Sequence, residues 1–122
     1  MFPSSGTDSA PHPLASKNVG SAHNPPAGVF TQPYATQLVL LALEDATEKG
    51  ILSESDVTQE KLEGFLSGFG RKFYKLPENT SGSKIVLERK GEKIATSIKR
   101  DDLEVGNSRA GTPVFSLRWE KA

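Results

Sequence analysis

The segment from Met1 to Pro33 holds six of the eight prolines in this 122-residue chain, and its charged side chains are limited to Asp8 and Lys17. Proline lacks a backbone N–H and fixes φ, so closely spaced prolines exclude both a long helix and a central β-strand. Such a segment is either a disordered tail or a loop that is shaped to fit a partner surface. Regular structure is therefore expected mainly from Gln32 onward.

A helix is expected to begin at Pro33. Proline suits the first turn of a helix, because its missing N–H would have no intrahelical partner there, and Gly50 is a good stop. Such a helix would be apolar around most of its circumference and would normally pack against two neighbouring elements. A free chain of this length offers little other surface to cover it. The apolar positions are Tyr34, Leu38, Val39, Leu40, Leu41, Ala42, Leu43 and Ala46.

A second helix is expected after Thr58, whose hydroxyl can cap the first turn. One apolar face is predicted for it, and Gly68 and Gly70 are expected to end it. Strand patterns follow: residues 85–88, a turn at Lys90-Gly91, a return over 94–98, and a last strand over 114–119. The apolar helix face comprises Leu62, Phe65, Leu66 and Phe69, and the last strand places Phe115, Leu117 and Trp119 on one side.

Charge and composition exclude several classes of function. Fifteen basic residues balance fifteen acidic ones, and acids are interleaved with the basic pairs, so no field or patch suited to nucleic acid is expected. No cysteine is available for disulfides or thiolate metal sites. The longest apolar run, 38–43, is far shorter than the roughly 20 residues that span a bilayer. No signal peptide is recognisable, and a cytoplasmic protein without membrane partners is expected.

Residues 6–12 place a carboxylate, Asp8, after a small turn-forming pair and an imidazole, His12, four residues later between two prolines. A carboxylate held in this way can ligate a metal or transfer a proton, and the imidazole can bind an anionic substrate. An Asx turn or a helix cap would explain Asp8 equally well. The sequence leaves these interpretations of Asp8 open.

Two further interpretations concern metal and backbone recognition. Asp8, His12 and His23 together would supply the minimum ligand set of a catalytic zinc, although their spacing matches no short metal motif. His12 could instead bind an anion beside a metal centre supplied by other residues. The small residues of 27–33 could present main-chain groups to a ligand, or could form a plain loop.

Three stretches, 6–13, 27–38 and 62–77, resemble the homodimeric type of dihydroorotase in its fungal form, and 109–113 with Trp119 also fits. The resemblance implies an α/β fold that is the carboxyl-terminal fragment of a (β/α)8 barrel. Residues 1–57 would hold the end of strand 8, an active-site loop and the last barrel helix. Residues 58–122 would form a helix and short β-strand extension.

The same resemblance implies a zinc-dependent cyclic amide hydrolase with two zinc ions, acting between L-dihydroorotate and N-carbamoyl-L-aspartate in pyrimidine biosynthesis. Asp8 would follow strand 8, ligate one zinc and act as general base and acid. His12 and the backbone at Ala27 would hold the substrate carboxylate. The complete family enzyme is a homodimer that binds this small-molecule substrate.

The family's His-x-His pair, carbamylated lysine, two further metal histidines and substrate-binding arginine and asparagine belong to earlier strands and are absent here. One hypothesis is that the chain is an incomplete enzyme that acts only with the rest of a barrel. The other is a catalytically inactive remnant that acts as a small protein-interaction module. In either case, the purified chain is expected neither to retain zinc tightly nor to hydrolyse dihydroorotate.

Overall fold

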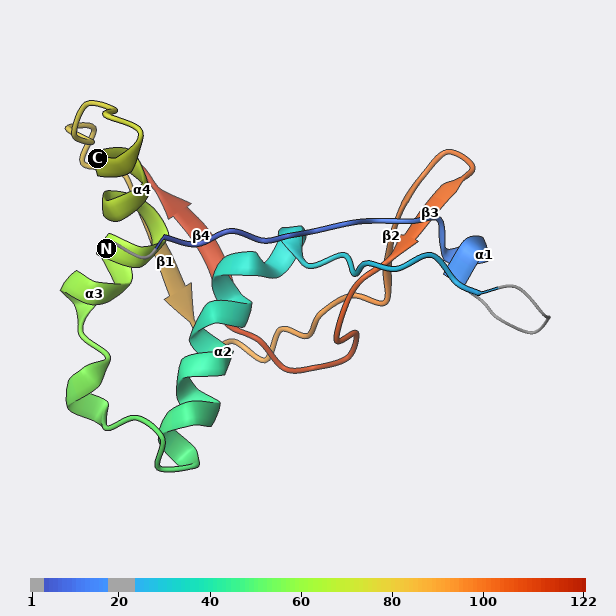
Figure 1. Ribbon diagram of the computed structural model, residues 1–122, viewed down its shortest axis with the longest axis horizontal. Helices are drawn as coiled ribbons and strands as arrows, with labels where there is room; N and C mark the ends of the chain where they lie inside the picture. Colours follow the sequence, from blue (N-terminus) through green and yellow to red (C-terminus); the bar gives the residue numbers. More distant parts are fainter. Residues whose placement is uncertain (1–3, 18–23) are drawn as a thin grey trace. The chain divides into compact units, whose positions relative to one another are not determined.

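The structure is a computed structural model that describes residues 4–17 and 24–122 (Figure 1). The chain forms two compact units. The first comprises Thr36–Glu88, Leu117–Ala122 and the described residues before Thr7; the second comprises Thr7–Ala35 and Arg89–Ser116. Helices and short strands both occur, which confirms a mixed α/β content. The elements in chain order are α1 (Leu14–Lys17), η1 (Gln32–Tyr34), α2 (Ala35–Glu48), η2 (Glu54–Asp56), α3 (Gln59–Glu63), η3 (Gly64–Gly68), α4 (Phe69–Phe73), β1 (Lys84–Glu88), β2 (Ser97–Arg100), β3 (Leu103–Gly106) and β4 (Ser116–Glu120).

The helix expected from Pro33 is confirmed. Pro33 lies in the 3-10 turn η1, which leads directly into α2. The helix ends as expected at Gly50, whose φ of 69° allows the amide of Ile51 to reach back to the carbonyl of Ala46 at 2.9 Å. Its leucines are only half-buried, and Gln37 is its one buried residue. The broad apolar face of α2 is therefore incompletely covered.

The second helix begins as predicted but does not end as predicted. Thr58 caps α3 by accepting a hydrogen bond from the amide of Lys61 at 3.3 Å. The helical path then continues through the π-helical turn η3 and through α4 to Phe73, so the expectation that Gly68 and Gly70 end it is wrong. Glycine ends a helix where φ turns positive, whereas Gly68 has a φ of −59°. The positive φ, 55°, is found instead at Lys75.

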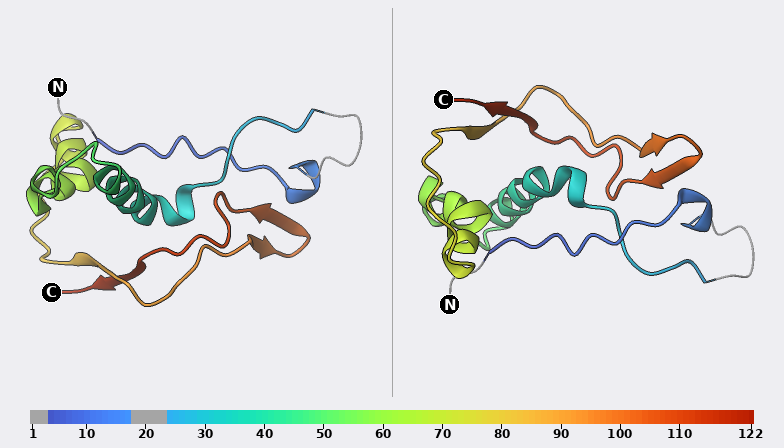
Figure 2. Two further views of the ribbon diagram at one scale, coloured as in Figure 1. Left: turned by 90° about the horizontal axis from the view of Figure 1, so that it is seen from below. Right: turned by 90° about the horizontal axis from the view of Figure 1, so that it is seen from above.

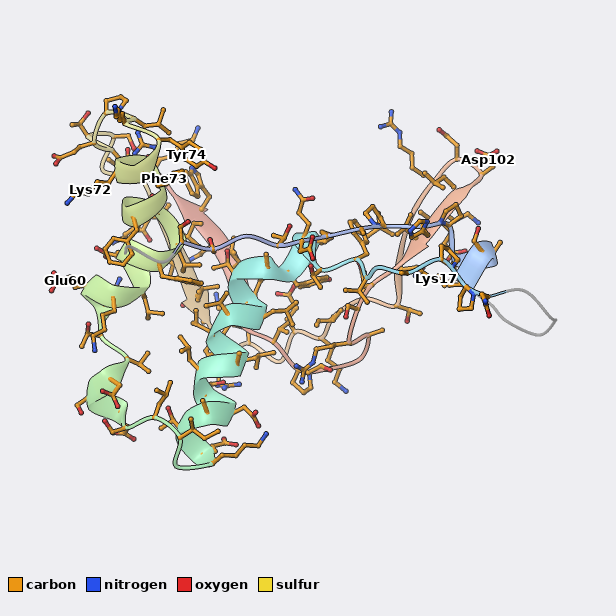
Figure 3. The ribbon with its side chains drawn as sticks, in the orientation of Figure 1. Lys17, Glu60, Lys72, Phe73, Tyr74 and Asp102 are labelled. Atoms are coloured by element: carbon orange, nitrogen blue, oxygen red, sulfur yellow. The ribbon has the colours of Figure 1, made fainter. Side chains whose placement is uncertain are left out.

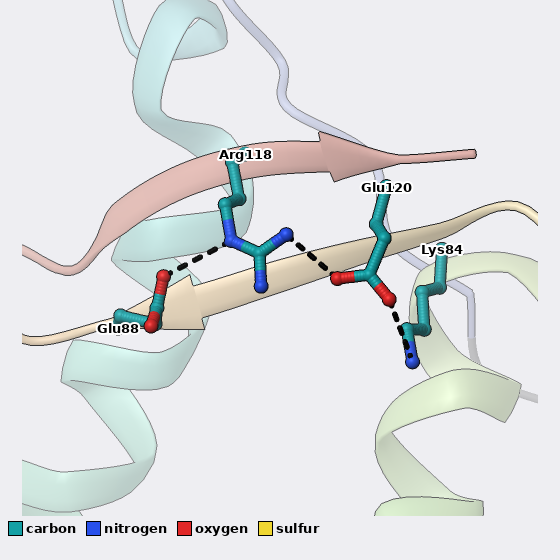
Figure 4. Close-up of polar contacts among 4 residues, drawn as sticks. All are labelled: Lys84, Glu88, Arg118 and Glu120. Carbon is teal, nitrogen blue, oxygen red and sulfur yellow. Dashed lines mark hydrogen bonds and ion pairs between the residues drawn. The ribbon is translucent and has the colours of Figure 1, made fainter.

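Strands β1 and β4 form a two-stranded antiparallel ribbon in the first unit (Figure 4). Strand 85–88 is thus confirmed, and the predicted last strand begins two residues late, at Ser116. One face carries charge: the guanidinium of Arg118 contacts Glu88 at 3.1 Å and Glu120 at 2.6 Å. The hydrogen bond from Arg118 lowers the pKa of Glu120 below its ordinary value of 4.5. By strand alternation, Leu117 and Trp119 lie on the opposite face, where Trp119 is 60% exposed.

The predicted hairpin between strand 85–88 and a strand over 94–98 is wrong. The bend at Gly91 exists, with a φ of 77°, but β1 pairs with β4, and β2 pairs with β3 in register Ser97↔Gly106 to Arg100↔Leu103. Figure 2 shows the β2–β3 hairpin from two further directions. Its turn passes through Asp101 at a φ of 53°, a conformation that aspartate tolerates better than most side chains.

The second unit contains the best-buried apolar side chains of the described residues. Ile94 and Val114 are each 2% exposed, and they are the buried hydrophobic residues of the ranges that the structure describes. Backbone hydrogen bonds hold them together: the amide of Ile94 donates to Thr112 at 3.0 Å, and that of Val114 donates to Glu92 at 2.9 Å. This small core lies within residues 89–116.

The barrel interpretation and the division at residue 57 stay predictions. Residues 1–3 of the expected strand 8 lie outside the described residues, and Ser4 and Ser5 are not in a strand. Each compact unit is discontinuous in sequence and does not coincide with either predicted part. Within the described ranges, no helix has the length and apolar character needed to cross a membrane.

Candidate functional site

Asp8 lies in an extended segment of the second unit, six residues before α1, and its side chain is exposed. Its φ is 43°, a left-handed conformation that is uncommon for residues other than glycine but that aspartate, as at Asp101, tolerates better than most side chains. The turn around it is held by Thr7, whose hydroxyl accepts a hydrogen bond from the amide of Ser9 at 3.3 Å. No helix begins at Asp8, so it does not cap one.

The neighbours of Asp8 bind a second segment, 24–32, through side-chain hydrogen bonds. The hydroxyl of Ser9 accepts hydrogen bonds from the amides of Thr31 at 3.2 Å and Gln32 at 3.3 Å. The hydroxyl of Thr31 donates to the carbonyl of Thr7 at 3.2 Å. Asp8 is thus bracketed by two residues that are both anchored to Thr31. These contacts hold the backbone on both sides of Asp8.

Backbone contact between the same segments is close at Gly28. The amide of Ala10 donates to the carbonyl of Val29 at 2.9 Å. Gly28 has a φ of +109°, and a Cβ added there would lie 2.6 Å from the Cβ of Ala10 and 2.8 Å from its carbonyl oxygen. Only glycine fits this approach without displacing a neighbour. The glycine of 27–33 therefore allows the two segments to meet.

Ala27 lies next to this contact and is exposed. The ammonium group of Lys17 donates to the carbonyl of Gly28 at 2.7 Å and also to the carbonyl of Pro26, on either side of Ala27 (Figure 3 labels Lys17). This ammonium fixes the backbone of Ala27 and places a positive charge beside it. The sequence does not predict this role of Lys17, although Lys17 is the one lysine or arginine before Tyr34, which is a usable signal.

His12 is half-buried between Pro11 and Pro13. Pro13 forms an isolated antiparallel bridge with Val105, which fixes the backbone next to the imidazole. The structure therefore places Asp8 and His12 on one segment and Ala27 on the segment paired with it, within a single compact unit. An exposed carboxylate, an imidazole and a fixed loop backbone can together transfer a proton and bind an anion.

The described residues do not by themselves fit a zinc centre. No group of three His, Cys, Asp or Glu side chains within 4–17 and 24–122 lies close enough together to hold a metal ion. His23, the third ligand considered from the sequence, lies outside the described residues. Asp8 can supply one ligand, so any zinc bound there would need ligands from another stretch of polypeptide.

The comparisons with known proteins point to one family, although no protein-family model matches the chain. It is 37% identical over 97 residues to the probable dihydroorotase of Schizosaccharomyces pombe, with 79% of this chain and 25% of that protein covered. It is 36% identical over 115 residues to the dihydroorotase of Hahella chejuensis, with 94% of this chain and 28% of that protein covered.

Solved structures agree. The crystal structure of Saccharomyces cerevisiae dihydroorotase in complex with 5-fluoroorotic acid matches 96% of the chain at a TM-score of 0.73 and 30% identity, over 30% of that protein. Campylobacter jejuni dihydroorotase matches at a TM-score of 0.57 and 25% identity, over 29% of its length. The chain is thus related to the amidohydrolases. More specifically, it is homologous to part of the dihydroorotases and spans between 25% and 30% of these relatives.

Proposed function

We propose that this chain is the carboxyl-terminal portion of a dihydroorotase and serves the cytoplasmic interconversion of L-dihydroorotate and N-carbamoyl-L-aspartate as part of a complete (β/α)8 barrel. In this proposal, residues 1–57 contribute the end of strand 8, the active-site loop and the last barrel helix. Residues 58–122 are the extension. Support comes from the homology, which extends over most of the chain in relatives from different organisms.

The observation that carries the proposal is the hydrogen-bonded pairing of the Asp8 segment with the Ala27 segment, through Ala10 and Val29 at 2.9 Å. It brings a candidate proton-transfer group and a candidate anion-binding backbone into one unit, although Ala27 and Asp8 are far apart in sequence. In hydrolysis of a cyclic amide that carries a carboxylate, the first group would transfer the proton and the second would bind the carboxylate.

The residues have separate roles. Asp8 accepts a proton from the water that attacks the carbonyl carbon of the ring amide, and returns it to the ring nitrogen as the C–N bond breaks. His12 and the backbone of Ala27 bind the substrate carboxylate, and the ammonium of Lys17, which donates to Gly28 at 2.7 Å, keeps that backbone in place. In the complete family enzyme, Asp8 would supply one ligand to a two-zinc centre, which would provide an activated water for attack on the amide. The remaining ligands would have to come from the strands that this chain lacks, and the homodimer of the family would form in the complete protein.

A hybrid enzyme tests the proposal. The region of S. cerevisiae dihydroorotase that matches this chain, 119 residues, is replaced by the chain, and consumption of dihydroorotate is followed with zinc present. We expect turnover that Asp8→Asn lowers by about 100-fold or more, the usual weight of a positioned acid–base group. His12→Ala is expected to raise KM for dihydroorotate with a smaller effect on kcat.

The matched control is Asp45→Asn, because Asp45 is an exposed carboxylate on α2 that pairs with nearby Lys49, at 2.6 Å. It is expected to leave turnover unchanged. A folded, active hybrid whose activity survives Asp8→Asn contradicts the proposed role of Asp8. A folded hybrid without activity contradicts the dihydroorotase function of the chain.

One observation favours the second candidate function, a small protein-interaction module without catalysis. Phe73 and Tyr74 at the end of α4 are 74% and 71% exposed, and their rings form an edge-to-face pair with centroids 5.0 Å apart (Figure 3). Aromatic side chains are enriched among the residues that anchor protein–protein interfaces, so this pair is a candidate docking point. Binding of the free chain to an intact dihydroorotase that Phe73→Ser abolishes, together with an inactive hybrid, would favour the module over the enzyme.

A further inference from the structure

The two segments of the candidate site form a compact unit with residues 89–116, which come much later in the sequence. We call these residues the support segment. The resemblance to the dihydroorotases places them in the carboxyl-terminal extension, whereas the predicted site residues all lie before residue 28. The contacts within the unit give them a different role.

Two hydrogen bonds connect the support segment to the residues around the anion-binding loop. The amide of Ser108 donates to the carbonyl of Phe30 at 2.9 Å, three residues after Ala27. The amide of Ala95 donates to the phenol oxygen of Tyr34 at 3.2 Å. The loop is therefore held on one side by the Asp8 segment and by the support segment at its carboxyl-terminal end.

The support segment also contacts the stretch that follows His12. Pro13 bridges Val105 in β3. A Cβ added at Gly106 would lie 2.9 Å from the Cδ1 of Leu14, so Leu14 packs directly over the backbone of Gly106. One corner of the support segment, Val105 to Ser108, thus contacts the backbone next to His12 and the loop next to Ala27.

Asn107 fixes this corner. It is 9% exposed; its amide donates to the carbonyl of Thr96 at 3.0 Å, and its Nδ2 donates to the carbonyl of Ala95 at 2.9 Å. Its Oδ1 is buried and accepts no hydrogen bond among the described residues. The side chain of Asn107 therefore stabilises the corner through its Nδ2 donor, because its Oδ1 acceptor has no hydrogen-bond partner in the described part of the chain. Loss of the donor would release the corner that carries the amide of Ser108.

We propose that Asn107 is a positioning residue of the substrate site: it holds the Val105–Ser108 corner, which in turn sets the backbone of the anion-binding loop and of the segment at His12. The binding of a substrate carboxylate by the loop rests on the proposed function. The structural coupling between Asn107 and the loop does not rest on that function, because it follows from the hydrogen bonds described above.

Amide hydrogen exchange of the full chain, followed residue by residue with NMR, tests this coupling. Asn107→Ala is expected to speed exchange of the Ala10 and Thr31 amides by about tenfold, the size expected when a buried hydrogen bond is lost. Asn107→Asp keeps the shape and the acceptor but removes the donor, so it is expected to have the same effect. Neither amide touches Asn107, and a role confined to the β2–β3 hairpin would leave both rates unchanged.

Asn79→Ala is the matched control, because Asn79 also organises a loop, accepting hydrogen bonds from the amide and hydroxyl of Ser81 at 3.1 and 2.8 Å, but in the first unit. It is expected to leave exchange at Ala10 and Thr31 unchanged.

In the Asn107 variants, faster exchange in β2 and β3 with unchanged rates at Ala10 and Thr31 would overturn the proposal. If both Asn107 variants unfold, Tyr34→Phe decides: it removes the acceptor for Ala95, and an unchanged rate at Thr31 would overturn the coupling. An inactive hybrid enzyme affects the proposed function alone, because exchange is measured in the free chain.

Discussion

Replacing Gly28 with alanine is expected to separate the two segments of the candidate site. Gly28 has a φ of +109°, and an added Cβ would lie 2.6 Å from the Cβ of Ala10. The backbone conformation alone costs an alanine roughly 1–3 kcal/mol. The overlap with Ala10 adds about 1–3 kcal/mol, the usual cost of forcing an extra methyl group into a packed contact. A total of about 3 kcal/mol is a conservative expectation from these two contributions.

The amide of Ala10 reports this change, because it donates to the carbonyl of Val29 across the contact. At about 1.4 kcal/mol per factor of ten, its hydrogen exchange is expected to accelerate by about 100-fold. Gly50→Ala is the control: its φ of +69° carries a similar backbone cost, but an added Cβ meets no atom within 4 Å. That variant should destabilise the end of α2 and leave Ala10 unchanged. An exchange rate at Ala10 within twofold of the parent in a folded Gly28→Ala variant would refute the close contact.

Two further predictions concern the first unit. Thr58→Ala removes the acceptor for the amide of Lys61 and is expected to lower the free energy of unfolding by about 1 kcal/mol in urea denaturation followed by helical circular dichroism; an equal loss in Thr58→Ser would contradict a capping role. The pKa of Glu120 is lowered chiefly by the hydrogen bond from Arg118, so the stabilisation it gives is complete above its ordinary value of 4.5 and is lost as the pH falls through the lower folded value. The fluorescence of the single tryptophan, Trp119, should change as the pH falls below 4.5 in the parent protein, and should not change in Arg118→Met. The same fluorescence change in both proteins would exclude the ion pair as the cause of the change.

The incomplete burial of α2 has a direct physical meaning. Its leucines are half-buried, and the buried hydrophobic residues of the described ranges, Ile94 and Val114, lie in the other unit. Covering the apolar face of a helix normally supplies most of its stability. The chain spans 25% to 30% of the relatives that it matches, and in the complete barrel that we propose, the remaining cover for α2 would come from other parts of the barrel.

Local chemistry was sufficient to predict α2, the start of α3 and the first strand. The turn at Pro33 that leads into α2, the stop at Gly50 that follows it and the cap at Thr58 each depend on residues within about one helical turn. The candidate residues Asp8, His12 and Ala27 were also chosen from short stretches, and the roles assigned to them stay predictions.

Distant residues determined the rest. Strand β1 pairs with β4 although both β2 and β3 lie between them in sequence, and the turn of the β2–β3 hairpin depends on the positive φ of Asp101. Gly28 contacts Ala10, and hydrogen bonds of Asn107 and Ser108 support the loop. No sequence pattern in these segments predicts that they contact one another. Hydrogen bonds within a helical turn are selected by the nearest side chains, whereas contacts between remote segments are selected only when folding brings their backbones together.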